Sequence, residues 1–219
     1  MVLSLIVCAF VQTPESHAFG KGKRLAAEDQ DKAIKVERKT GEAAELETAS
    51  WLNAIKTLAQ DGDWLVVRGY HSTDDLVAFG TNSAFSHAVV LDLTQNEIIE
   101  AVQPAVRIQT LPEFLANANR VRLVRPAGAS TEGGIERGRE AVESARSVVG
   151  QSYDLFGAIG IPSDKRFYCS ELAVWSWGIK VDKFGALNVV APKDIHKYGN
   201  ILFDSKDRDG VAEQLPAAQ

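Results

Sequence analysis

Apolar residues recur at three- and four-residue steps in several stretches of the chain, which is the spacing that one buried helix face produces. The first such stretch covers residues 43–58 and ends before the turn-forming pair Asp61-Gly62. Its apolar positions are Leu46, Trp51, Leu52, Ile55 and Leu58. This pattern predicts an amphipathic helix that lies on the surface of a domain.

Further helices are expected later in the chain. One covers residues 111–116, with Pro112 in its first turn. A longer one covers residues 131–149, with Thr131 as its N-cap and Gly150 just past its end. The last long one covers residues 169–179, starts at Cys169, and is followed by a turn or short helix at residues 191–196. Its apolar positions are Leu172, Ala173, Trp175 and Trp177.

Four short runs rich in β-branched and apolar residues lie between the first two helices and just after the second. They cover residues 64–67, 86–93, 97–102 and 120–124. Asn96 lies between the second and third runs, where it marks a hairpin turn. The runs predict a small antiparallel sheet.

Composition narrows the class of protein. The chain has 219 residues, of which 45% are hydrophobic, which is enough for one compact domain with flanking segments. The formal net charge is -5, so no overall positive field draws nucleic acid or anionic lipid to the protein. Cys8 and Cys169 are the only cysteines, and Cys8 lies in an N-terminal apolar run. We therefore expect no nucleic-acid partner, no stabilising disulfide, and a free thiol at Cys169.

The N-terminus resembles an export signal. Residues 2–11 form an apolar run of the length of a signal-peptide core, too short for a stable membrane span. Ser16 and Ala18 supply small residues at the two positions that a signal peptidase reads. No Lys or Arg precedes the run, so a buried N-terminal strand is the alternative. A signal predicts export to the periplasm or outside a bacterial cell, and its absence predicts a cytoplasmic protein.

Cys169 is the first candidate for chemistry. A thiol is a good nucleophile as its thiolate, which a helix N-terminus and a nearby imidazolium both stabilise. The predicted helix start at Cys169 supplies the first of these. A single Cys before an apolar helix also fits a small buried hydrophobe, so the surrounding sequence has to decide.

The surrounding motifs resemble a known family. Residues 150–154 read Gly-Gln-Ser-Tyr-Asp, and residues 167–172 read Phe-Tyr-Cys-Ser-Glu-Leu. Upstream, residues 62–66 read Gly-Asp-Trp-Leu-Val and residues 86–90 read Ser-His-Ala-Val-Val. In this order they resemble the permuted papain-like amidases, the YiiX-like group, which are circularly permuted relatives of the NlpC-type cell-wall endopeptidases.

The resemblance implies an α+β fold of the circularly permuted papain-like (NlpC-like) type, in which a small antiparallel barrel-like sheet packs against the nucleophile helix. It implies Cys169 as nucleophile, His87 as base and Glu100 as the residue that orients His87. Independently, a hairpin of residues 86–93 and 97–102 brings His87 and Glu100 to one face. Because the register is open, Gln103 is a lesser candidate, and Glu100 as a surface carboxylate and His87 as a core histidine are the alternatives.

Residues around Cys169 are candidates for binding the substrate. The backbone N–H of Cys169 is the natural oxyanion donor. Tyr153 is either a second donor, a wall of the substrate cleft, or a core tyrosine, and Tyr168 and Ser170 are expected to position the nucleophile. We expect no cofactor and no metal, because the His and Asp residues at 71–75 match no ligand spacing.

These features predict a cysteine hydrolase that cleaves an amide or peptide bond through a thioester. The expected partner is a peptide, amide or acyl substrate, with cell-wall peptide or lipid as candidates. The alternatives are a lipid acyl hydrolase or acyltransferase of the lecithin retinol acyltransferase type, and a non-catalytic binding module on the same fold. The predicted organisation is a signal peptide (1–18), a charged linker and amphipathic helix (19–60), the catalytic domain (61–205) and a frayed tail (206–219).

Overall fold

The structure, a computed structural model, describes residues 36–155, 157, 166–179, 189–206 and 213–214. The predicted signal peptide at residues 1–18 lies outside the described residues, as does the predicted linker before residue 36. The helices are α1 (Glu42–Leu58), α2 (Ser72–Thr81), α3 (Leu111–Ala116), α4 (Gly134–Ser147) and α5 (Cys169–Ser176), with 3-10 turns η1 (Ala127–Ser130) and η4 (Pro192–Tyr198).

The strands form one antiparallel sheet. They are β1 (Trp64–Gly69), β2 (His87–Asp92), β3 (Glu97–Ala101), β4 (Val106–Thr110), β5 (Ala118–Pro126), β6 (Gly199–Asp204) and β7 (Glu213–Gln214). Their order across the sheet is β4-β3-β2-β1-β5-β6-β7. Within the described residues β4 and β7 are the two edges, so the sheet is open rather than a closed barrel. Strand β7 lies inside the segment that was predicted to be a tail.

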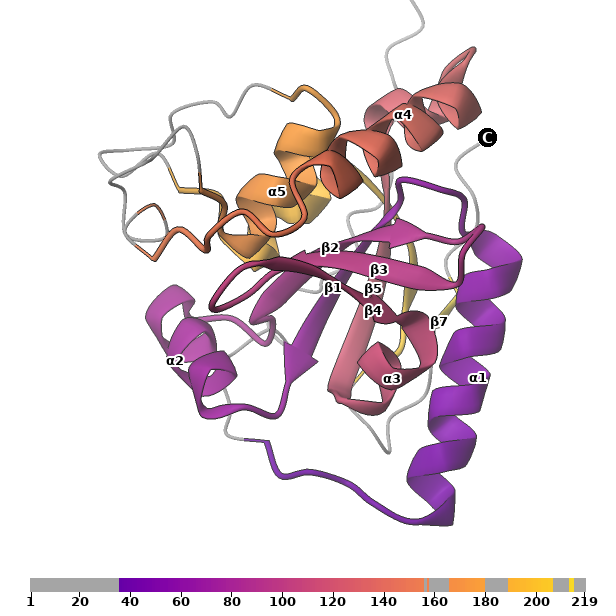
Figure 1. Cartoon of the computed structure of the whole chain (residues 1–219). Helices are drawn as coiled ribbons and strands as arrows, with labels where there is room; N and C mark the ends of the chain where they lie inside the picture. The colour runs from indigo at the N-terminus through magenta and orange to yellow at the C-terminus, as the bar shows by residue number, and fades with distance from the viewer. Residues whose placement is uncertain (1–35, 156, 158–165, 180–188, 207–212, 215–219) are drawn as a thin grey trace, which may run out of the picture.

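The sheet lies between two helical layers, with α4 and α5 on one face and α1 and α3 on the other (Figure 1). Successive residues of β1 serve both layers. Trp64 and Val66 pack in the core beneath α4 and α5, while Leu65 and Val67 pack in the core beneath α1 and α3. Because both faces of the strand are covered, its first four residues are all apolar instead of alternating with polar ones. This arrangement confirms the predicted α+β fold.

Local signals in the sequence account for several element boundaries. Asn96 has φ 58 and turns the chain between β2 and β3, as predicted for this hairpin. Helix α3 starts and ends where it was predicted. The hydroxyl of Thr110, at its N-cap, accepts the backbone N–H of Glu113, and Pro112 lies in the first turn.

The start of α4 and the end of α5 differ from the prediction because of tertiary and turn geometry. Thr131 does not cap α4: its hydroxyl donates to the carbonyl of Gly128 in η1, and α4 begins at Gly134. Helix α5 ends at Ser176 rather than residue 179. Gly178 follows with φ 64, a left-handed conformation that stops a helix.

Close backbone packing holds α4 and α5 beside the sheet. A Cβ atom on Gly62, which has φ 82, would lie 2.6 Å from the carbonyl oxygen of Gly138 in α4. The indole Nε1 of Trp177, just after α5, donates to the Gly62 carbonyl over 2.8 Å. The turn before β1 therefore needs glycine because two elements meet there.

Arg146 fixes the other end of α4. Its guanidinium donates to Asp92 at the end of β2 and to Glu97 at the start of β3. The same hairpin carries the candidate base and its carboxylate partner, so α4 helps to hold both.

Candidate active site

Three candidate residues come together from separate elements. Cys169 is the first residue of α5, His87 is the first residue of β2, and Glu100 lies on β3. Helix α5 packs against β2, which brings the helix start to the strand start.

The start of α5 is defined by its flanking residues. Tyr168 is extended, with φ -96 and ψ 167, and its backbone N–H donates to the carboxylate of Glu171 at the third helical position over 3.3 Å. The Tyr168 hydroxyl accepts the backbone N–H of Val190 over 3.1 Å. Both contacts fix the residue before Cys169.

The β2–β3 hairpin decides which polar side chain His87 contacts. Val90 pairs with Ile99 and Leu91 with Ile98, so His87 and Glu100 lie on the same face of the sheet. The His87 Nε2–H donates to Glu100 Oε2 over 2.8 Å. Gln103, the other candidate, is exposed.

The Cys169 thiol is an acidic one. The side chain is buried, and burial alone raises its pKa, but the hydrogen bond and charge of His87, together with other hydrogen bonds, bring it below the usual value. These other hydrogen bonds come from the backbone N–H of Ala88 and the hydroxyl of Ser170, 3.7 Å from Sγ. Its place at a helix N-terminus acts in the same direction.

The pKa of His87 shifts in the opposite direction, upward. Burial alone lowers its pKa, but the hydrogen bond and charge of Cys169, followed by those of Glu100, raise the pKa to about 10. Since Nε2 faces Glu100, Nδ1 is the nitrogen left for the sulfur. At neutral pH this arrangement favours a thiolate beside an imidazolium.

Arg107 is a site residue that the sequence analysis missed. Its Nε donates to Glu100 Oε1 over 2.8 Å from strand β4, directly across from Glu100. Burial raises the pKa of Glu100, but His87 and then Arg107 lower it to a value below the usual one. The alternation of apolar and polar residues in Val106–Thr110 was the signal for this strand.

Tyr153 lies close enough to Cys169 to feel its charge. Its ring is half-buried, and burial, followed by the charge of Cys169, raises the pKa of its hydroxyl. An isolated bridge between Tyr153 and Phe167 joins its segment to the residues before α5. Tyr153 therefore lies beside Cys169 and also packs against the hydrophobic core beneath α4 and α5.

Helix α2, which the sequence analysis did not predict, is tied to the residue before the base. The Ser86 hydroxyl donates to Asp74 over 2.7 Å and accepts the Gly69 backbone N–H over 3.1 Å. Asp74 also accepts the backbone N–H of His71 over 2.9 Å. The polar residues at 71–75 thus start a helix and anchor it beside His87.

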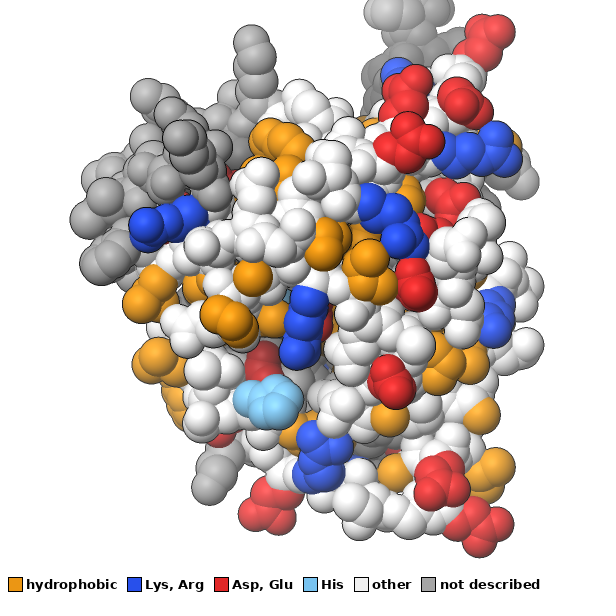
Figure 2. All heavy atoms as spheres, viewed as in Figure 1, with side chains coloured by type: hydrophobic (Ala, Val, Ile, Leu, Met, Phe, Trp, Pro, Cys, Tyr) orange, Lys and Arg blue, Asp and Glu red, His pale blue; other side chains and the backbone are white. Residues whose placement is uncertain are grey.

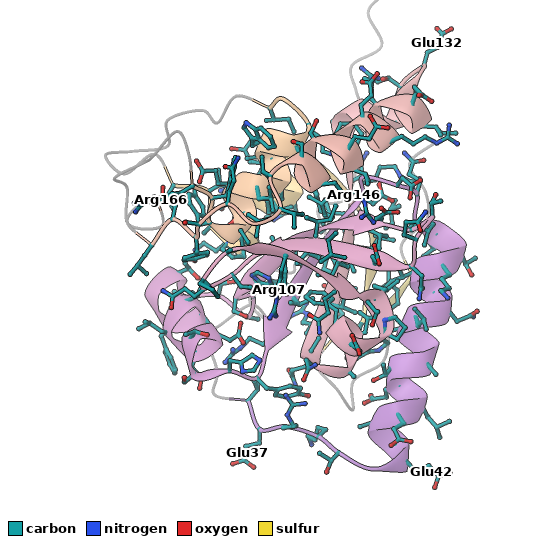
Figure 3. The ribbon with its side chains drawn as sticks, viewed as in Figure 1. Glu37, Glu42, Arg107, Glu132, Arg146 and Arg166 are labelled. Atoms are coloured by element: carbon teal, nitrogen blue, oxygen red, sulfur yellow. The ribbon has the colours of Figure 1, made fainter. Side chains whose placement is uncertain are left out.

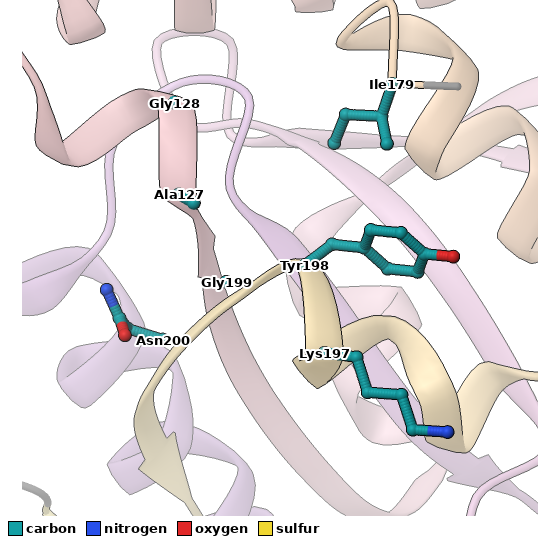
Figure 4. Close-up of a pocket in the computed structure, with 7 residues that line it drawn as sticks. All are labelled: Ala127, Gly128, Ile179, Lys197, Tyr198, Gly199 and Asn200. Carbon is teal, nitrogen blue, oxygen red and sulfur yellow. The ribbon is translucent and has the colours of Figure 1, made fainter. Parts of the chain in front are cut away.

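Other features of the described residues lie outside this site. A cavity of about 400 Å³ opens between η1, η4 and the start of β6 (Figure 4). Its walls come from Ala127, Gly128, Ile179, Lys197, Tyr198, Gly199 and Asn200. Among the described residues no cluster of three or more His, Cys, Asp or Glu side chains is placed to hold a metal ion. Within the same ranges, no helix is both long and apolar enough to span a bilayer.

The comparisons with known proteins concern most of the chain. The family model described as "Permuted papain-like amidase enzyme, YaeF/YiiX, C92 family" matches residues 59–214. A similar solved structure is that of the metalloprotein YiiX from Escherichia coli O157:H7, which is 22% identical, with a TM-score of 0.48 over 74% of this chain and 91% of that chain. No curated protein matches the chain.

Proposed function

Since the chain belongs to the permuted papain-like amidase family, we propose that it is a cysteine hydrolase that cleaves an amide or peptide bond. The family match identifies the chain as a papain-like amidase in the broad sense. That a cysteine thiolate carries out the cleavage is the part that we propose. The observation that carries it is the continuous contact from Glu100 through His87 to Cys169 at the start of α5.

In the first half of the reaction the Cys169 thiolate attacks the carbonyl carbon of the scissile amide. The imidazolium of His87 gives its proton to the departing amine, the carbon–nitrogen bond breaks, and a thioester remains on Cys169. In the second half, His87 takes a proton from water, and the resulting hydroxide attacks the thioester. The carboxylic acid leaves and the thiolate is restored.

The charge that develops on the carbonyl oxygen needs donors. The backbone N–H of Cys169 is in the first turn of α5, where no carbonyl within the helix accepts it. Tyr153 is the candidate for a second donor, and its alternative role is to line the cleft. Ser170, which is buried against Sγ, helps to hold the sulfur.

The substrate class remains a proposal. The predicted export signal favours a cell-wall peptide, and the expected localisation is outside the cytoplasm. A lipid acyl group is the rival substrate, and a binding module without catalysis is the rival function.

Paired substrate assays test this proposal. Muropeptides and phospholipids are incubated in parallel with the wild-type protein and with Cys169→Ala. New amine and carboxyl ends from the muropeptides, absent with the variant, are the expected result. Release of fatty acid instead would move the function to lipid chemistry. No turnover on either substrate, or equal turnover by Cys169→Ala, would contradict the cysteine hydrolase.

A further inference from the structure

Glu100 has two partners, one on each carboxylate oxygen. His87 Nε2 donates to Oε2 and Arg107 Nε donates to Oε1, each over 2.8 Å. The Glu100 side chain is 3% exposed and that of Arg107 is 59% exposed. The buried carboxylate therefore joins the imidazole to a guanidinium at the surface, which Figure 3 labels at the front of the sheet.

Two partners restrict the carboxylate more than one does. The last torsion of a Glu side chain is broad, so a single hydrogen bond leaves the group free to swing. The pairing of β3 with β4 places Arg107 directly opposite Glu100, and its planar guanidinium presents a fixed donor. With Oε1 held in this way, Oε2 stays directed at His87.

Charges alternate along the row from Cys169 to Arg107. The ionisable groups around Glu100 are His87 and Arg107. Those around Cys169 are His87, Tyr153 and Tyr168. The hydrogen bond and charge of Arg107 favour the ionised form of the Glu100 carboxylate.

We infer that Arg107 is a positioning residue, which acts through Glu100 to hold the His87 imidazole toward Cys169. The inference rests on the Cys169–His87 pair of the proposed function. Arg107 contacts Glu100 and none of the reacting atoms, so its removal should change thiol reactivity while the cleft stays intact.

Removing Arg107 affects the thiol in two ways that have the same sign. Loss of a nearby positive charge disfavours the thiolate. A less firmly held carboxylate also stabilises the imidazolium less, which disfavours the thiolate again. Both effects raise the pKa of the Cys169 thiol. The acid limb of the rate profile, which is the pH range over which alkylation speeds up as the thiolate forms, therefore moves to higher pH. Arg107 is mostly exposed and Glu100 keeps its hydrogen bond to His87, so stability should change less than when a fully buried ion pair loses one partner.

The test is the rate of alkylation by iodoacetamide as a function of pH, in protein carrying Cys8→Ser so that Cys169 is the sole thiol. Arg107→Gln should move the acid limb up by about half a pH unit, so that alkylation below the midpoint is about threefold slower. Arg107→Lys keeps the charge without the fixed fork and should move the limb by less. Arg139→Gln is the control, because Arg139 is also 59% exposed and pairs with Glu136 on α4.

The outcomes separate this inference from the proposed function. An acid limb unchanged by Arg107→Gln, while His87→Ala still slows alkylation, would overturn the positioning role alone. If His87→Ala has no effect, the proposed pair itself fails. A lower melting temperature with an unmoved acid limb would make Arg107 merely structural and also contradict the inference. Should Arg107→Gln fail to fold, an unshifted limb in Arg107→Lys would overturn it.

Discussion

Two buried carboxylates in the same sheet are held by cations in different ways. Asp204 on β6 accepts from Arg120 over 2.7 Å and from Arg122 over 2.8 Å, and all three side chains are buried. Glu100 on β3 accepts from Arg107, which is exposed, and from His87. Both carboxylates thus have two cationic partners, but among the four partners His87 is the imidazole and the other three are guanidiniums.

That difference separates a structural cluster from a candidate catalytic one. The guanidiniums of Arg120 and Arg122 also lie over the ring of Phe85, at 4.8 and 4.3 Å from its centroid. Permanently charged groups packed in this way join β5 to β6 and exchange no proton. His87, in contrast, can gain or lose a proton and reaches a thiol. The remaining charges on the face in Figure 2 are of both signs and scattered.

The largest expected effect is on stability, at Asp204. Asp204→Asn removes the charge that two buried guanidiniums share, and it should lower the free energy of unfolding by about 3–5 kcal/mol. Urea denaturation measures this change. Glu136→Gln, in an exposed pair, is the control and should change stability by less than about 1 kcal/mol. Equal effects of the two substitutions would remove the structural role of the Asp204 cluster.

Glu100→Gln should reduce activity more than stability, which is the reverse of the result expected for Asp204→Asn. The neutral amide no longer stabilises the imidazolium, and its NH₂ group competes with the donors of His87 and Arg107. We expect kcat/KM for an amide substrate to fall roughly tenfold to a hundredfold. Parallel urea denaturation should show a smaller loss than Asp204→Asn. An unchanged kcat/KM would place Glu100 with Asp204 as a structural carboxylate.

The smallest expected effect that distinguishes the two clusters is on the pH dependence of activity. The reactive form needs the Cys169 thiolate and the His87 imidazolium together. It is present above the lowered pKa of Cys169 and is lost as pH rises through about 10, the raised pKa of His87. A rate profile with an acid limb below the usual thiol range and an alkaline limb near pH 10 is expected.

Asp204 should contribute to neither limb. Burial raises its pKa, but Arg120 and Arg122 together lower it below the usual 3.8. Its stabilising contribution is therefore present above that value and is lost as pH falls through the lower folded-state pKa. Acid unfolding, followed by circular dichroism, should respond to Asp204→Asn while the activity limbs of the folded protein stay in place.

The sequence predicted the parts of the site that depend on local patterns. Cys169 at a helix start, His87 on a strand and Glu100 across a hairpin all follow from motifs and from one short turn at Asn96. Hairpin partners are close in sequence, and the pairing of Val90 with Ile99 is the register that puts His87 and Glu100 on one face.

What the sequence did not predict depends on weak local patterns and on contacts between distant segments. Strand β4, with Arg107, is half exposed and short, so its pattern is weak. The pairing of Asp204 with Arg120 and Arg122 joins residues 82 to 84 positions apart. Helix α4 starts at Gly134, after Gly133 in a left-handed conformation, because Thr131 bonds to Gly128 in η1 instead of capping the helix. Tertiary packing therefore fixed contacts and element boundaries that hydrophobic periodicity could not predict.

The most direct test of the account is the alkylation rate of Cys169 as a function of pH, with and without His87. In protein carrying Cys8→Ser, iodoacetamide should modify Cys169 rapidly near pH 6, because the ion pair holds the thiolate. In His87→Ala the same rate should be reached only as pH approaches about 8.5, the value of an ordinary thiol. Identical profiles for the two proteins would contradict the Cys169–His87 pair.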